Sequence, residues 1–231
     1  MTLARRLAAE ALGSALLLAM VLGSAIMAGR LAGGNAAIAL LANSLASGAG
    51  LLVLILTFGP VSGAHLNPVV TLSEALQGRM AWRAAFPYAA AQAIGAAAGV
   101  AAAHAMFGEA VFSAATSARA GAPLWWSEFV ATFALVGVII GCSRHRPGIT
   151  PFAVAAYIVS AYWFTASSSF ANPALTLARA ATDSVAGIRI GDVAGYVGAQ
   201  LLGAVCATGV FAWLFGQDEA APAPAFSPRC R

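Results

Sequence analysis

The sequence contains no lysine and few charged side chains of any kind. Of its 231 residues only 9% are charged and 61% are hydrophobic, and the net charge of +4 comes from 12 arginines set against 8 acidic residues. A soluble domain carries about a quarter charged residues, so this chain has too little polar surface to face water on all sides. The composition excludes an ordinary soluble domain and predicts a protein that lies in a lipid bilayer.

Cysteine is also scarce. Cys142, Cys206 and Cys230 are far apart and show neither metal-ligand spacing nor the even count of a disulfide framework. The arginines sit at the ends of apolar stretches, which is typical of topology signals and not of a nucleic-acid-binding patch. We therefore expect no metal site, no cofactor and no nucleic-acid partner.

Long apolar stretches dominate what is present. A membrane-spanning helix needs about 20 predominantly apolar residues, and six stretches qualify: residues 7–29, 37–59, 84–106, 124–142, 150–168 and 193–215. The first is too long for a signal peptide and lacks a clear cleavage site. The Pro- and Ala-rich residues 217–231 are expected to form a disordered tail.

An even number of spans places both termini on one side of the membrane. That side would hold eight arginines and the opposite side four, Arg30, Arg119, Arg179 and Arg189. The positive-inside rule then predicts cytoplasmic termini for a multi-pass protein of a cell membrane, a bacterial inner membrane being favoured.

Two further stretches are apolar but too short to cross. Residues 67–77 and 172–182 both begin with Asn-Pro, which is a helix-start signal, because Asn caps free backbone N–H groups and Pro is tolerated at the first helical position. Each is predicted to be a short helix that starts inside the protein. For one copy alone, an ordinary capped surface helix would be the better interpretation.

The two copies belong to a larger duplication. Asn67 and Asn172 are 105 residues apart, Glu10 and Glu128 are 118 apart, and the Gln residues of "PYAAAQAIG" and "GYVGAQLLG" are 108 apart. Each half, residues 5–107 and 122–216, has three spans, so the second half enters the membrane from the opposite side. Inverted repeats of this kind place broken helices at the bilayer midplane, where the halves meet.

That arrangement predicts a polar junction within the lipid. Non-helical backbone survives at membrane depth only where it is buried or lines a water-filled cavity. We expect the stretches before the two Asn residues to present carbonyl groups to a pore, and the Asn amide groups to present N–H donors. Two positive helix ends at one point repel cations, so the site suits uncharged polar solutes.

The paired motifs "SGAHLNPVVTL" and "NPALTL", with the two Glu and two Gln positions, resemble the aquaporin or major intrinsic protein family over about residues 5–215. Val69 departs from the usual Ala of the first motif. The resemblance implies an all-α membrane protein with six spans and two re-entrant half-helices, a pore in each subunit and a homotetramer. It also implies functional residues in four groups. The Asn-Pro motifs are Asn67, Pro68, Val69, Asn172, Pro173 and Ala174; the pore carbonyls are Gly63, Ala64, His65, Ser168, Phe170 and Ala171; the supports of the re-entrant segments are Glu10, Glu128, Gln92 and Gln200; the outer selectivity filter is Ser47, Ser160, Ser169 and Leu175.

The filter residues depart from the family pattern of aromatic side chains and an arginine. Counted from the Asn residues without gaps, the four positions hold three serines and Leu175, with Gly48 or Ala161 as alternative occupants. Arg179 lies four residues beyond Leu175; it either guards the outer mouth or, as we favour, reaches the interface or pairs with Asp183. Such a filter is expected to be wide and to lack a fixed charge.

These features predict a passive channel for water and small uncharged solutes, glycerol and neutral metalloid acids such as arsenous acid among them. Around the second motif the chain looks like aquaglyceroporin-like channels of bacterial arsenic-resistance operons. The alternatives are a water-selective aquaporin, a secondary transporter, a membrane protein with a blocked pore, and an intramembrane serine protease built on Ser62 and His65. The protease is disfavoured because no base is placed to reach a serine hydroxyl, and we expect no enzymatic activity.

Overall fold

The computed structural model describes residues 1–216, and within that range its regular elements are all helices, with no strand. Six helices are long and apolar enough to span a membrane, the fifth span including a short 3-10 turn before α6. The helices are α1 (Leu3–Leu31), α2 (Ala36–Ser62), α3 (Pro68–Leu76), α4 (Trp82–Phe107), α5 (Ala122–His145), α6 (Thr150–Phe164), α7 (Pro173–Ala178) and α8 (Ile190–Leu214), with 3-10 turns η1 (Pro147–Ile149) and η2 (Arg179–Ala181).

The predicted fold class is confirmed. All six spans lie where the hydropathy pattern places them, although α1 continues beyond both predicted ends and α6 ends at Phe164, four residues early. The residues after Phe164 turn away from the helix and run extended toward Asn172. The predicted tail, residues 217–231, lies outside the described residues.

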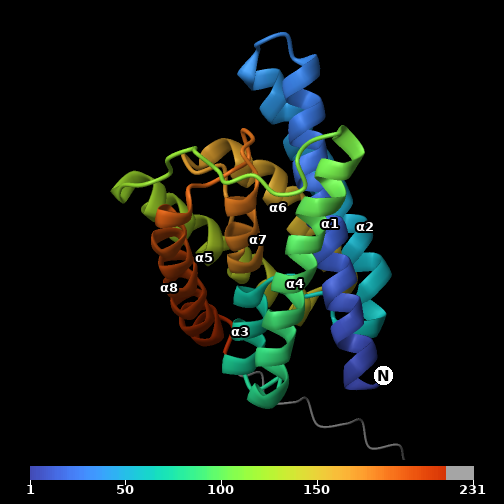
Figure 1. Ribbon diagram of the computed structural model, residues 1–231. Helices are drawn as coiled ribbons and strands as arrows, with labels where there is room; N and C mark the ends of the chain where they lie inside the picture. Colours follow the sequence, from blue (N-terminus) through green and yellow to red (C-terminus); the bar gives the residue numbers. More distant parts are fainter. Residues whose placement is uncertain (217–231) are drawn as a thin grey trace, which may run out of the picture.

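Helices α3 and α7 are the two half-helices, and they lie between the spans in Figure 1. Asn67 and Asn172 have extended backbone and cap the two helices, with the side-chain oxygen accepting from Val69 N at 3.0 Å in the first and from Ala174 N at 3.1 Å in the second. Each helix has proline at its first position, where the missing N–H costs nothing. The capped Asn-Pro starts predicted from the sequence are therefore present in both halves.

Helix α1 packs most extensively on α4, and α5 packs on α8, which is the equivalent pair in the other half. Glycine permits this approach. A Cβ atom on Gly95 would lie 2.0 Å from the carbonyl oxygen of Ala11, and one on Gly203 would lie 2.6 Å from that of Phe129. Backbone in contact with backbone leaves no flexible side chain to move aside, so these positions fix the helix crossings.

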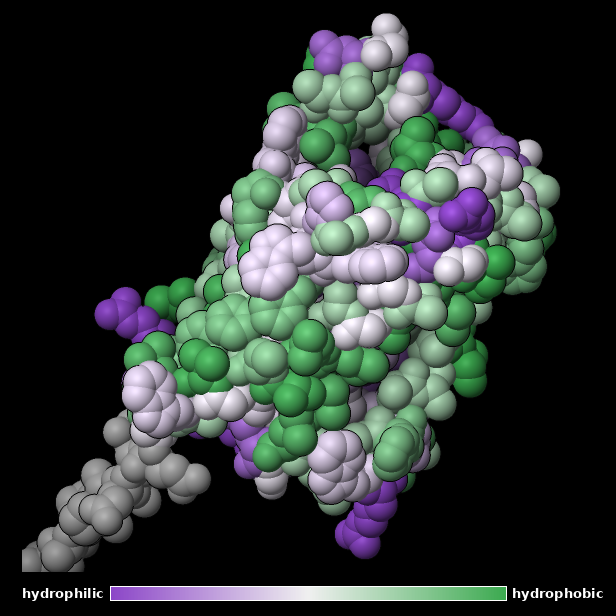
Figure 2. Space-filling model, turned by 90° about the vertical axis from the view of Figure 1, so that its left-hand side faces the viewer, coloured by the Kyte–Doolittle hydropathy of each residue, from purple (hydrophilic) through white to green (hydrophobic). Residues whose placement is uncertain are grey.

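The surface fits a bilayer. Figure 2 shows one side of the molecule with hydrophobic and neutral residues across its middle and hydrophilic residues gathered toward the two ends. Large apolar side chains on the spans remain more than a third exposed, among them Leu16, Leu56, Ile94 and Leu202. They have no protein to pack against within this chain, which lipid or a second copy would supply.

Substituting Gly95 by alanine tests the α1–α4 contact. We expect G95A to lower the midpoint of thermal unfolding in detergent, because the added methyl group must push the two backbones apart at a cost of about 1–3 kcal/mol. The matched control is G209A in α8, where an added Cβ meets nothing within 4 Å. Alanine there gains helix propensity of about 1 kcal/mol, so a G95A midpoint at or above that of G209A would contradict this packing.

Candidate functional site

The half-helices meet head to head through their capping asparagines. Asn67 Nδ2 donates to the carbonyl oxygen of Ala171 at 2.7 Å, and Asn172 Nδ2 donates to that of Leu66 at 2.8 Å. Each asparagine therefore caps its own helix and holds the backbone that leads to the other. We expected the Asn amides to present N–H donors to the pore; one N–H of each asparagine is committed to this crossed pair, and one remains.

Two buried carboxylates support the extended segments. Glu10 accepts from the backbone N–H of His65 at 3.0 Å and of Leu66 at 2.7 Å, while Glu128 accepts from those of Phe170 at 2.9 Å and Ala171 at 2.8 Å. Both glutamates are fully buried. Each carboxylate satisfies two N–H groups that the non-helical backbone leaves without partners, which is the scaffold role expected from the sequence.

A glutamine and a threonine complete each support. Gln92 donates from Nε2 to Glu10 at 2.8 Å and to Thr71 at 3.0 Å. Gln200 makes the equivalent contacts, to Glu128 at 2.6 Å and to the second-half threonine, Thr176, at 2.9 Å. The threonines were not predicted, although their identical place in the repeated "NP-x-x-TL" pattern was a usable signal.

The segments before the asparagines are strained in a matching way. Ala64, Leu66, Ser169 and Ala171 all have positive φ between 45° and 51°, which costs a side-chain-bearing residue of order 1–3 kcal/mol each. The carbonyl groups of residues 63–65 and 168–170 accept no hydrogen bond from any described residue. Unpaired carbonyls at this depth need water or solute as partners.

A cavity of about 130 Å³ runs along these groups. Its apolar walls come from rows of side chains four residues apart, which is the spacing of one helix face. These rows are Leu17 and Val21 of α1, Ser47, Leu51 and Ile55 of α2, Leu135 and Ile139 of α5, and Val154, Ile158 and Tyr162 of α6. Its polar lining includes both asparagines and five of the six predicted carbonyl residues, Gly63, Ala64, His65, Phe170 and Ala171. Ser168 does not line it.

A second cavity, of about 430 Å³, adjoins the first at Gly63 and His65 and opens beside Arg6 and Glu74. His65 Nδ1 contacts Thr71 Oγ1 at 3.0 Å, and the Ser62 hydroxyl donates to Glu10 at 2.6 Å. Serine and histidine thus have separate partners, and the geometry gives no nucleophile–base pair.

The outer part of the cavity corrects the predicted filter. Ser47, Ser169 and Leu175 line it, whereas Ser160 is exposed and faces away. Tyr162, two residues along α6, takes the inward position and donates to Ser47 Oγ at 3.2 Å. Residues two apart lie on opposite sides of a helix with about 3.6 residues per turn, so the ungapped count chose the wrong face.

The alternative filter residues do not line the cavity either. Ala161 is buried next to Tyr162, and a Cβ on Gly48 would lie 2.3 Å from Val159, at the contact between α2 and α6.

Arg179 also does not lie at the interface or beside Asp183, where we expected it. It is only 6% exposed, it lines the cavity, and its guanidinium carbon lies 3.3 Å from the ring centre of Phe170. Asp183 is exposed and accepts from the backbone N–H and hydroxyl of Thr116, which lower the pKa of its carboxyl below the usual value. The expectations that Arg179 reaches the interface or pairs with Asp183, and that the filter region lacks a fixed charge, are wrong.

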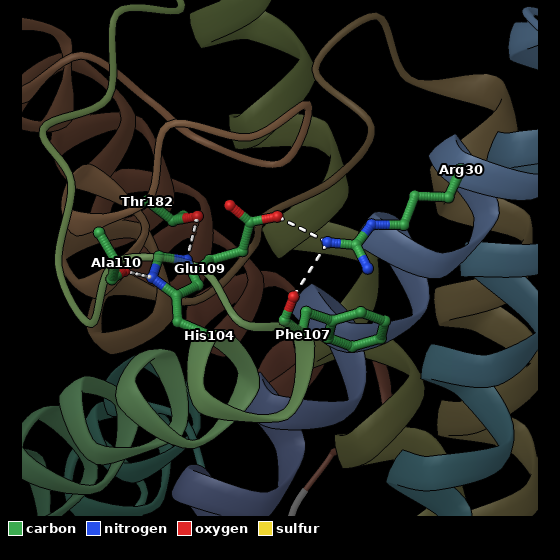
Figure 3. A network of polar contacts seen from close by, with 6 residues as sticks. All are labelled: Arg30, His104, Phe107, Glu109, Ala110 and Thr182. Carbon is green, nitrogen blue, oxygen red and sulfur yellow. Dashed lines mark hydrogen bonds and ion pairs between the residues drawn. The ribbon is translucent and has the colours of Figure 1, made fainter.

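A polar network at the end of the bundle opposite the chain start (Figure 1) holds the loop after η2. Figure 3 shows His104 between Ala110 and Thr182, with its Nε2 2.8 Å from Thr182 Oγ1, and Arg30 reaching Glu109 at 2.8 Å and the carbonyl of Phe107 at 3.1 Å. His104 is 2% exposed, so it ties the end of α4 to the loop that follows Arg179. Sequence reasoning missed this because it depends on the path of two loops.

Comparisons with known proteins agree with this geometry. Residues 1–166 match the family model described as Major intrinsic protein. The chain is 50% identical over 212 residues to the aquaglyceroporin AqpS of Rhizobium meliloti, covering 92% of this chain and 91% of that one. It is 31% identical over 195 residues to aquaporin Z of Photorhabdus laumondii, covering 75% and 82%. Its fold is similar to the X-ray structure of the aquaglyceroporin from Plasmodium falciparum, with a TM-score of 0.71 at 18% identity over 93% of this chain and 97% of that one.

Replacing Glu10 by glutamine tests the support of the first extended segment. E10Q turns one acceptor into an N–H₂ group that faces donors, and each buried group left unpaired costs about 1–3 kcal/mol. We expect a clear drop in unfolding midpoint in detergent. The control is E109Q, whose partner Arg30 is half exposed and whose ion pair contributes about 0–1 kcal/mol. Equal midpoints for the two variants would contradict the support role.

Proposed function

The chain belongs to the major intrinsic protein family, and on that premise we propose that its pore passes small uncharged solutes larger than water, glycerol and neutral metalloid acids such as arsenous acid among them, as well as water. Members of this family are membrane channels and not enzymes.

The observation that carries the proposal is the chemistry of the junction. A passing molecule meets N–H donors from Asn67 and Asn172 and unpaired carbonyl acceptors from both extended segments. Glu10 and Glu128 are occupied by backbone N–H groups, and no carboxylate lines the cavity in the described part of the chain. A hydroxyl group both accepts and donates, so neutral polyhydroxy solutes match this lining best.

The side chains at three of the predicted filter positions support solutes beyond water. Ser47, Ser169 and Leu175 are small or flexible, and Tyr162, Phe170 and Arg179 line the cavity beside them. Pore width and lining groups decide selectivity in channels. The relative from Rhizobium meliloti, which is called an aquaglyceroporin, is consistent with glycerol as one solute.

A water-selective pore and a secondary transporter can each be distinguished from this proposal by flux measurements. A water-selective pore would pass water and reject both larger solutes. A secondary transporter would need a site for a coupling ion at the midplane, where asparagine amides and carbonyls lie instead, and its flux would saturate and follow a proton or sodium gradient.

The proposal also includes a homotetramer and cytoplasmic termini, and the arginines bear on the position of the termini. Arg6, Arg79 and Arg83 line neighbouring cavities at the end that holds the start of α1, and Arg144 bonds the carbonyl of Gly216 after α8. Figure 1 places the start of α1 and the end of α8 at the same end of the bundle. The arginine bias toward that end supports its assignment to the cytoplasm, by the positive-inside rule.

Stopped-flow measurements on proteoliposomes, with water, glycerol and arsenous acid as permeants, test the solute class. Wild-type protein is expected to pass all three. S47F, which places a ring in the outer cavity, is expected to reduce glycerol and arsenous acid flux at least about tenfold, since pore diameter governs passage. The matched control is S160F, because Ser160 faces away from the cavity, and it should leave all fluxes unchanged. A wild-type pore that passes water alone would refute the proposed solutes.

A further inference from the structure

Arg179 is a buried cation on the wall of the pore. No carboxylate in residues 1–216 forms an ion pair with it, and its two terminal nitrogens donate to no described residue. Its Nε donates to the carbonyl oxygen of Ala186 at 2.5 Å. A guanidinium has five N–H donors in a rigid fork, and the four on its terminal nitrogens have no partner among the described residues.

The position of this side chain is fixed from several sides. The Phe170 ring lies against one face of the guanidinium, with Arg119 5.1 Å from the same ring centre. Arg119 also donates to the carbonyls of Val185 and Gly187, which flank Ala186. With His104 holding Thr182 (Figure 3), the loop that orients Arg179 is tied down at both ends.

A lone charge at this depth is costly. Removing a cation from water without a paired anion costs several kcal/mol, and intramembrane ionisable groups mark solute or ion pathways. A second polar group nearby also lacks a protein partner: Ser169 lines the same cavity, and its hydroxyl is buried and makes no hydrogen bond to a described residue. The cavity wall beside Arg179 therefore holds two polar groups that no described residue satisfies.

We propose that Arg179 is the specificity-determining residue of the pore. It reaches the cavity from a turn beyond Leu175, donates from its terminal nitrogens to two neighbouring oxygen atoms of a neutral solute, such as a 1,2-diol or a trihydroxy acid, and repels cations by its charge. This deepens the proposed function and rests on it. It also assigns the role to a position outside the family's filter pattern, which holds Leu175 in this chain.

Variants in proteoliposomes separate the effect of the positive charge of Arg179 from the effect of its paired terminal N–H donors. R179Q removes both, and we expect cation leak to rise at least about tenfold, since a unit charge a few ångströms away in a partly buried site exceeds the thermal energy several times. The glycerol-to-urea permeability ratio should fall as well, because urea offers one oxygen. R179K keeps the charge without the fork, so it should keep the low cation leak and lose the glycerol preference.

A second route leaves Arg179 intact. S169D places a carboxylate in the same cavity to neutralise the guanidinium, and S169N is the matched neutral variant; both residues tolerate the positive φ of 49° at this position. S169D is expected to leak cations more than S169N. R83Q removes an exposed arginine at the end of the bundle that holds the chain start and should behave as wild type.

The outcomes separate the two proposals. Wild-type cation leak and glycerol-to-urea ratio in both R179Q and S169D would overturn the role of Arg179 while leaving glycerol passage standing. A wild-type pore closed to glycerol would overturn the diol-binding part together with the proposed solutes, and the leak of R179Q and S169D would then decide the cation barrier alone. Should R179Q fail to reconstitute, the comparison of S169D with S169N decides it.

Discussion

Backbone polar groups cannot be left unpaired in the hydrocarbon of a bilayer. The structure depends on how this chain satisfies such groups beside the two half-helices, which begin inside the protein. Asn67 and Asn172 cap the interrupted helices and bond across to the opposite half. Glu10 and Glu128 take up the N–H groups of the extended segments. Four backbone donors of these segments are thereby satisfied within the protein, while the carbonyls of residues 63–65 and 168–170 accept no hydrogen bond from residues 1–216. The polar surface that remains is the pore.

The two halves share this framework but differ at the outer end. The first extended segment begins at Gly63, and its residues Gly63 and His65 line the second cavity, which opens toward the side of the chain start. The second leads into α7 and η2, where Leu175 and Arg179 line the cavity, and Arg119 and His104 bind the loop that follows. The duplicated framework surrounds the cavity, and we propose that Arg179, held by the unduplicated loop, distinguishes one solute from another.

Much of the fold and of the site could be predicted because pairing backbone groups within the membrane requires particular residue types at particular places. Polar residues are rare within the apolar spans, so the spacing of the paired Asn, Glu and Gln residues pointed to equivalent supports in opposite halves. The half-helices, the spans and the buried glutamates followed from it. What could not be predicted depends on tertiary paths. Ser160 and Tyr162 lie on opposite faces of α6, and the sequence does not show which face turns toward the cavity. Counting residues back from Asn172 also crosses the non-helical segment before it, whose length in space the sequence does not give. Predicting the position of the Arg179 side chain required the path of residues 182–188, because the carbonyl of Ala186 sets its orientation.

The central claim is that the half-helices meet tip to tip and that solute crosses at their junction. An experimental structure in lipid, determined with glycerol present, tests it most directly. We predict hydrogen-bonding distances from Asn67 Nδ2 to the Ala171 carbonyl and from Asn172 Nδ2 to the Leu66 carbonyl, with solute density beside both asparagines. Half-helices that lie apart, or a junction closed by side chains with density for solute elsewhere, would contradict the account.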